Sequence, residues 1–67
     1  LAVYPNPTTN YITISDDFES YIIYDLSGRV QSVGYQKYID VSNFEVGTYF
    51  IQILSGNEIK TAKFVKL

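Results

Sequence analysis

The sequence predicts an all-β domain, folded as a sandwich of about seven short antiparallel strands. Apolar and polar residues alternate in several short runs, which is the pattern of strands with one buried face. Gly, Asn and Ser residues separate these runs at spacings of roughly 8 to 12 residues, as is typical of an immunoglobulin-like sandwich with Greek-key connections. No segment keeps the helical period of about 3.6 residues.

The first predicted strand, residues 1–4, is an edge strand. It stops at Pro5-Asn6-Pro7, because two prolines remove two backbone donors and are excluded from the middle of a sheet. A second strand is predicted at residues 11–15, where strict alternation places Ile12 and Ile14 inward.

Residues 21–25 form the third predicted strand, and its inward face is ambiguous. The Ser-Gly pair within residues 26–29 is typical of a hairpin turn, so this segment connects to a fourth strand at residues 30–33. A fifth strand is predicted at residues 38–41, with its second and fourth residues inward.

The stretch 41–53 is the segment around which the predicted fold is organised. Asn43 and Gly47 bracket a turn, because Asn tolerates left-handed backbone and Gly adopts positive φ without a Cβ clash. The strand at 48–53 then contains almost only β-branched and aromatic residues. Its fully apolar face is formed by Tyr49, Ile51 and Ile53.

The seventh predicted strand, residues 58–65, has imperfect alternation, which indicates a bulge. Lys60, Lys63 and Lys66 recur at every third position, so Lys63 and Lys66 point in opposite directions from a strand. Two interpretations stay open. The lysines protect an exposed sheet edge from aggregation, or they belong to a basic, apolar segment that another protein docks, for example by adding a strand.

Length and composition predict one domain spanning residues 1–67. Because the chain begins within a predicted strand, we expect it to be a fragment of a larger protein, which the resemblance described below implies is secreted. A chain of this size buries only about 60% of its unfolded surface, and without Cys it has no disulfide to stabilise it. A net charge of −2 argues against nucleic acid and anionic membranes as partners. No apolar run approaches the roughly 20 residues needed for direct membrane insertion.

The residues that usually carry catalysis are absent. The chain contains neither His nor Cys, so the commonest general base and the strongest nucleophile are missing. Asp16, Asp17 and Glu19 form an acidic cluster, but a small sandwich has little room for a catalytic cleft between carboxylates, and their spacing matches no Ca²⁺ loop. We therefore predict no enzymatic activity, no metal and no cofactor.

The abundance of tyrosine suggests a different class of function. Tyr faces stack on sugars, so a small carbohydrate-binding or adhesive sandwich attached to a secreted enzyme is an alternative function, with exposed rings such as Tyr35 and Tyr38 as the contacts. Tyr49 lies on an apolar strand face, where core packing is the default. A spacer domain without any partner is a third hypothesis. The seven tyrosines are residues 4, 11, 21, 24, 35, 38 and 49.

Four motifs follow one another along the chain: Tyr4-Pro5-Asn6-Pro7, Tyr24-Asp25-Leu26-Ser27-Gly28-Arg29, Gly47-Thr48-Tyr49 and Lys63-Phe64-Val65-Lys66. In this order and spacing they resemble the type A C-terminal sorting domain of the type IX (Por) secretion system. The resemblance covers essentially the whole chain. It departs from the family before the Thr-Tyr pair, where such domains often have Leu-Pro-Ala-Gly and this sequence has Phe44-Glu45-Val46-Gly47.

The resemblance implies an immunoglobulin-like module that directs an upstream passenger protein across the outer membrane. Such domains follow secreted enzymes and adhesins that enter the periplasm by a signal peptide. The implied partners are the type IX translocon, outer-membrane shuttle components and a sortase-like surface protease that removes the domain. The cargo is then released or anchored at the surface of a Gram-negative cell.

Residues carried over from the family fall into two groups. The recognition group is expected to be exposed, so that replacing its two lysines by Ala leaves the thermal midpoint nearly unchanged while lowering secretion. This group comprises Lys63, Phe64, Val65, Lys66 and Leu67. The group that identifies the family and shapes the fold comprises Pro5, Asn6, Pro7, Asp25, Gly28, Gly47, Thr48 and Tyr49.

Overall fold

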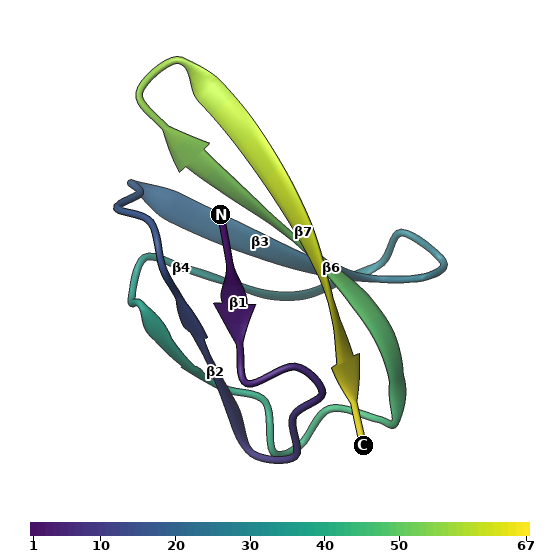
Figure 1. The fold of residues 1–67 in the computed structure, drawn as a ribbon. Coiled ribbons are helices and arrows are strands. Elements are labelled where there is room, and N and C mark those ends of the chain that lie inside the picture. Colours follow the sequence, from purple (N-terminus) through teal and green to yellow (C-terminus); the bar gives the residue numbers. More distant parts are fainter.

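A computed structural model describes all residues, 1–67, as two antiparallel sheets packed face to face (Figure 1). It has seven strands and no helix, so no helix is present that is long and apolar enough to cross a membrane. The strands are β1 (Val3–Tyr4), β2 (Tyr11–Ile14), β3 (Ser20–Asp25), β4 (Val30–Gly34), β5 (Tyr38–Asp40), β6 (Gly47–Ser55) and β7 (Glu58–Lys66).

The strand order is β1-β2-β5 in the smaller sheet and β4-β3-β6-β7 in the larger one. The chain changes sheet between β2 and β3, between β4 and β5, and again before β6, so that β2 pairs with β5 and β3 pairs with β6. Such non-consecutive pairs are those of Greek-key connections. The predicted all-β class is confirmed, and the arrangement is compatible with an immunoglobulin-like sandwich.

The core lies between the two sheets and takes alternate residues from each strand. The residues predicted to point inward from the second, fifth and sixth strands are all buried. On β3, where the sequence leaves the face ambiguous, Tyr21 and Ile23 point inward. The buried apolar cluster consists of Val3, Ile12, Ile14, Tyr21, Ile23, Ile39, Val41, Tyr49, Ile51, Ile53 and Phe64.

Two local expectations are wrong. The β6–β7 ladder runs without a register shift, and the irregularity lies instead between Ile23 and Tyr24, where β3 pairs with β4. The alternation of β7 is imperfect because Lys66 is buried on its inner face while Ile59 is exposed on the outer one. The predicted turn before β6 is present, since the Phe44 amide donates to the Val41 carbonyl at 3.0 Å, but Asn43 within it is not left-handed. The positive φ of +153° belongs to Gly47, the first residue of β6.

Removing part of a central core side chain is expected to cost much of the stability of this small domain. Ile51 is fully buried on β6, so Ile51→Ala should lower the free energy of unfolding by about 2–5 kcal/mol. The matched control Val33→Ala, 64% exposed on β4, should change it by less than about 0.5 kcal/mol. Urea denaturation followed by circular dichroism measures both values, and equal effects would contradict this core.

Candidate recognition site

The segment after β1 covers the free edge of β7, where the larger sheet ends. The Asn6 side-chain Nδ2 donates to the carbonyl of Lys63 at 3.1 Å, and its Oδ1 accepts from the Val65 amide at 2.9 Å. The carboxamide therefore supplies the donor and the acceptor that a peptide group of a neighbouring strand would supply. Both flanking peptide bonds, Tyr4–Pro5 and Asn6–Pro7, are cis.

Thr8 continues this pairing by one more step. Its amide donates to the Val65 carbonyl at 2.9 Å, and its carbonyl accepts from the Leu67 amide at 2.8 Å. Its hydroxyl donates to the Tyr11 carbonyl, and the residue is 2% exposed. Asn6 and Thr8 together occupy the Lys63 carbonyl, both backbone groups of Val65 and the Leu67 amide, so an added strand finds this part of the edge already paired.

Lys66 is buried, contrary to the expectation of an exposed lysine. Only 6% of the residue is exposed, and its ammonium group donates to the main-chain oxygens of Phe44 and Leu67, both at 3.2 Å. The residue shares the inner face of β7 with Phe64, and the two carbonyl groups replace the water that its charge would otherwise bind. Lys66 therefore joins β7 to the loop between β5 and β6.

Tyr49 lies at the same end of the core. Its hydroxyl donates to the Glu45 carbonyl at 2.6 Å, and its ring packs between Phe44 and Phe64 with centroid distances of 5.0 and 5.5 Å. Burial raises the pKa of the Tyr49 hydroxyl, and the nearby negative charges of Glu45 and Asp25 raise it further. The tyrosine of the Gly-Thr-Tyr motif thus has a structural role, holding the loop before β6 against the core.

Asp25 closes the hairpin between β3 and β4. One carboxylate oxygen accepts the amides of Ser27 and Arg29, both at 2.9 Å, and the other accepts Arg29 Nε at 3.0 Å and Gln31 Nε2 at 3.1 Å. These donors, first of all the Arg29 amide, hold the pKa of Asp25 below its ordinary value. Gly28 supplies the positive φ, +83°, that the turn requires.

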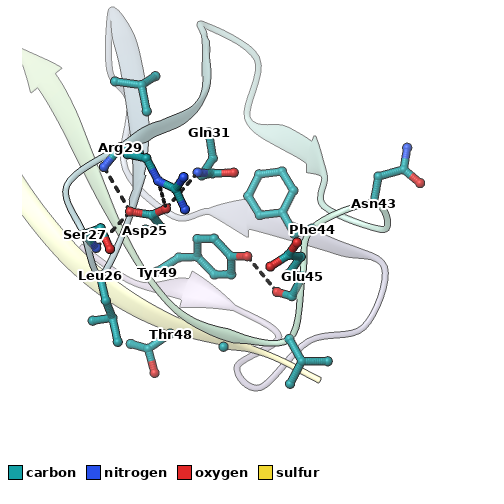
Figure 2. A pocket seen from close by; sticks show the side chains of 13 residues that line it. Asp25, Leu26, Ser27, Arg29, Gln31, Asn43, Phe44, Glu45, Thr48 and Tyr49 are labelled. Carbon is teal, nitrogen blue, oxygen red and sulfur yellow. Dashed lines mark hydrogen bonds and ion pairs between the residues drawn. The ribbon is translucent and has the colours of Figure 1, made fainter.

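A cleft of about 780 Å³ separates this hairpin from the loop before β6. Figure 2 shows Asp25 and Arg29 on one side of the cleft and Phe44 and Glu45 on the other, with the Tyr49 ring between them. Every oxygen of Asp25 is already hydrogen-bonded within the hairpin, so the cleft offers no free catalytic carboxylate from this residue.

Comparison of the sequence with models of known protein families identifies the family of this domain. The family described as secretion system C-terminal sorting domain matches residues 2–67. The chain belongs to this family. It is a C-terminal sorting signal for type IX secretion, and the carbohydrate-binding alternative is not favoured. No curated protein and no solved structure matches the chain.

Membership of the sorting-domain family implies a binding role. The domain interacts with the secretion machinery, and the protein that carries it is secreted or attached to the surface of Gram-negative Bacteroidetes. Sorting domains are not a catalytic family, which is consistent with the prediction of no enzymatic activity.

The structure separates the predicted recognition residues of this sorting domain by exposure. Lys63 and Leu67 are exposed and Val65 is half-buried, whereas Phe64 and Lys66 are buried. All four family motifs meet at one end of the sandwich. The Pro-Asn-Pro motif pairs with the terminal motif, the terminal motif pairs with the Gly-Thr-Tyr motif, and Tyr49 of that motif pairs with Asp25. Sequence reasoning did not predict these long-range contacts. The one residue that could have indicated them is Asn6, because a carboxamide between two prolines can replace the backbone hydrogen bonds that the prolines cannot donate.

The acidic residues and tyrosines singled out in the sequence lie elsewhere. Asp16 pairs with Lys60 at 3.2 Å and Asp17 with Lys37 at 3.0 Å. On the outer face of the smaller sheet, Tyr11 and Tyr38 stack on each other with centroids 4.8 Å apart. These two rings therefore use one face each on a neighbour inside the domain.

Removing the Asn6 carboxamide should release the terminal residues of β7. Asn6→Ala loses one donor and one acceptor, so we expect the free energy of unfolding to fall by about 1–2 kcal/mol. Hydrogen exchange of the Val65 amide should accelerate more than that of amides in β3. Asn10→Ala, which removes a carboxamide with no side-chain hydrogen bond, is the control and should leave the Val65 amide protected. Unchanged exchange in Asn6→Ala would contradict this pairing.

The lowered pKa of Asp25 predicts a stability difference that depends on pH. The ionised carboxylate stabilises the folded state above its unfolded pKa, near 3.8, and this contribution disappears as pH falls through the lower folded value. Asp25→Asn should therefore lower the thermal midpoint at pH 7, and the gap from wild type should close below about pH 4. Asp17→Asn, at an exposed ion pair, is the control and should show little gap at either pH.

Proposed function

We propose that the type IX machinery recognises the folded domain at the end of β7, with Lys63 and Leu67 as contact residues. One observation carries this proposal. The chain has five Lys and Arg residues, and Lys63 is the one whose charged group has no hydrogen bond or ion pair. Arg29, Lys37 and Lys60 pair with aspartates, and Lys66 bonds to main-chain oxygens.

The backbone pairing supports side-chain recognition at this edge. The outward carbonyl of Lys63, both backbone groups of Val65 and the amide of Leu67 already bond to Asn6 or Thr8. Strand addition there requires that segment to leave, whereas the exposed Lys63 side chain is available without any rearrangement. We assign Phe64, Lys66 and Asn6 the role of holding β7 in position rather than of contacting the partner.

The finer steps of the pathway belong to the same proposal. Residues 1–67 act as a single module of the type A subclass, following a passenger protein that reaches the periplasm by its own signal peptide. Outer-membrane shuttle components and the translocon bind the module, and a sortase-like surface protease removes it. The passenger is then released or anchored at the cell surface.

A periplasmic reporter fused to residues 1–67 tests the proposal in cells with a type IX system. The wild-type fusion should be exported, and Lys63→Ala should reduce export while the thermal midpoint of the purified domain stays within about 2 °C, because an exposed charge contributes little to folding. Lys37→Ala is the matched control and should be exported normally. Retention of the wild-type fusion would refute the proposal.

The two lysines are expected to behave differently. Lys66→Ala leaves the main-chain oxygens of Phe44 and Leu67 without their donor, so the free energy of unfolding should fall by about 1–3 kcal/mol. This replaces the expectation that both lysines are dispensable for folding. Thermal denaturation of the two single variants distinguishes them, and equal midpoints would contradict the assigned roles.

A further inference from the structure

The outward face of the β4-β3-β6-β7 sheet is uncovered and carries a group of apolar side chains beside the polar Thr48, Gln52 and Thr61. Residues that alternate with the core positions point away from the smaller sheet, and we call this surface the outer apolar face. Val33 on β4 and Ile59 on β7 are 64% and 68% exposed. The apolar residues used below are Val33, Ile22, Tyr24, Phe50, Leu54 and Ile59.

The strand register places these residues in rows across the sheet. Tyr24 pairs with Phe50, which pairs with Lys63, and Leu54 pairs with Ile59. Ile22 pairs with Val33 on one side and with Gln52 on the other. A shallow hollow of about 200 Å³ lies between Ile22, Leu54 and Ile59. Lys63 is the one charged side chain on this face, next to Phe50.

Apolar residues on both sides of a sheet need an explanation in a domain this small. An antiparallel sheet that covers a core on one side usually shows polar residues to water on the other. The outer face of the smaller sheet carries Thr13 and Asp40 beside exposed tyrosines, whose rings end in hydroxyl groups. Contiguous exposed apolar surface usually marks an interaction site. The outer apolar face is continuous with Lys63, the residue assigned above to recognition.

We propose that the outer apolar face docks a protein component of the secretion machinery whose surface is apolar and carries a carboxylate that pairs with Lys63. This inference rests on the proposed function and extends the contact from the end of β7 across the sheet to β4. A lysine covered by an apolar partner needs an opposite charge, because burying an unpaired ammonium group away from water is strongly unfavourable. The outer apolar face itself has no carboxylate to supply it.

Charge argues against two other occupants. Two copies packed face to face would bury two Lys63 side chains without any carboxylate between them. A single lysine attracts a lipid surface only weakly, and the domain as a whole carries a charge of −2. A protein surface with one acidic group in an apolar surround matches the face best.

Export of the reporter fusion tests this surface. The double variant Val33→Ser with Ile59→Ser should reduce export about tenfold or more, since each side chain loses buried apolar contact with the partner. Lys63→Glu should reduce export more than Lys63→Ala, because it opposes the partner's carboxylate. Leu26→Ser is the matched control, an exposed apolar residue in the β3–β4 turn, and should be exported normally. Thermal midpoints of the purified variants verify that all are folded.

The outcomes separate this inference from the function on which it rests. Normal export of the Val33 and Ile59 double variant, with export still lost in Lys63→Ala, would overturn the docking face and leave the proposed function standing. Retention of the wild-type fusion would overturn both.

Two measurements on the purified domain test the occupant. Sedimentation should show a monomer, and a dimer abolished by Ile59→Ser would assign the face to a second copy instead. Flotation with anionic lipid vesicles should show no binding, and binding abolished by Lys63→Ala would assign the face to lipid.

Crosslinking in cells tests the protein partner directly. A photo-crosslinker at Val33, but not at Thr13 on the opposite sheet, should capture a protein of the secretion machinery. Acid-to-Lys replacement in that protein should rescue Lys63→Glu, and failure of every acidic position to do so would overturn the charge pairing.

Discussion

The pairing of Asn6 with β7 is the interaction on which the geometry of the candidate site depends. A side-chain carboxamide carries one acceptor and two donors, so it substitutes for a peptide group where the flanking prolines have no amide to offer. This pairing connects the segment that follows β1, in the smaller sheet, to β7 at the edge of the larger sheet. Thr8 adds two backbone bonds to the same edge, and the position of residues 63–67 is thereby fixed from outside the sheet.

Fixing the outer edge of β7 has consequences on its inner face. With Val65 held by Asn6 and Thr8, its neighbours Phe64 and Lys66 point into the sandwich. Phe64 packs on Tyr49, and Lys66 reaches the carbonyl of Phe44 in the loop before β6. Segments that are far apart in the sequence therefore hold one another in place. In a chain without disulfides, these contacts cover one end of the core.

Most of the fold was predictable because alternation is a local property. Residues such as Ile12, Ile14, Ile51 and Ile53 identify their strands and inward faces from the sequence alone. On β3 alternation fails, since Ile22 on the outer apolar face is as apolar as Ile23 in the core. Where both faces of a strand are apolar, the alternation of residue types cannot show which face is buried.

The site was less predictable than the fold. Periodicity assigned Lys63 and Lys66 to opposite faces correctly, but it does not say which face is inward, and a lysine is assumed to be outside. The contact that buries Lys66 joins it to Phe44, a loop residue in a segment where the sequence departs from the family pattern. Its acceptor is a main-chain carbonyl, which every residue type provides, so no side-chain identity in the sequence signals it.

Recognition through a folded surface differs from recognition of a terminal peptide. In an unfolded chain Lys63 has only its sequence neighbours, whereas in the sandwich it lies beside Phe50 of β6, which in turn pairs with Tyr24 of β3. On the proposed function, a partner that requires this row of side chains binds the folded domain and discriminates against the unfolded one. The pairing of Asn6 and Thr8 with β7 then contributes to sorting without contacting the partner, because it holds Lys63 in register with that row.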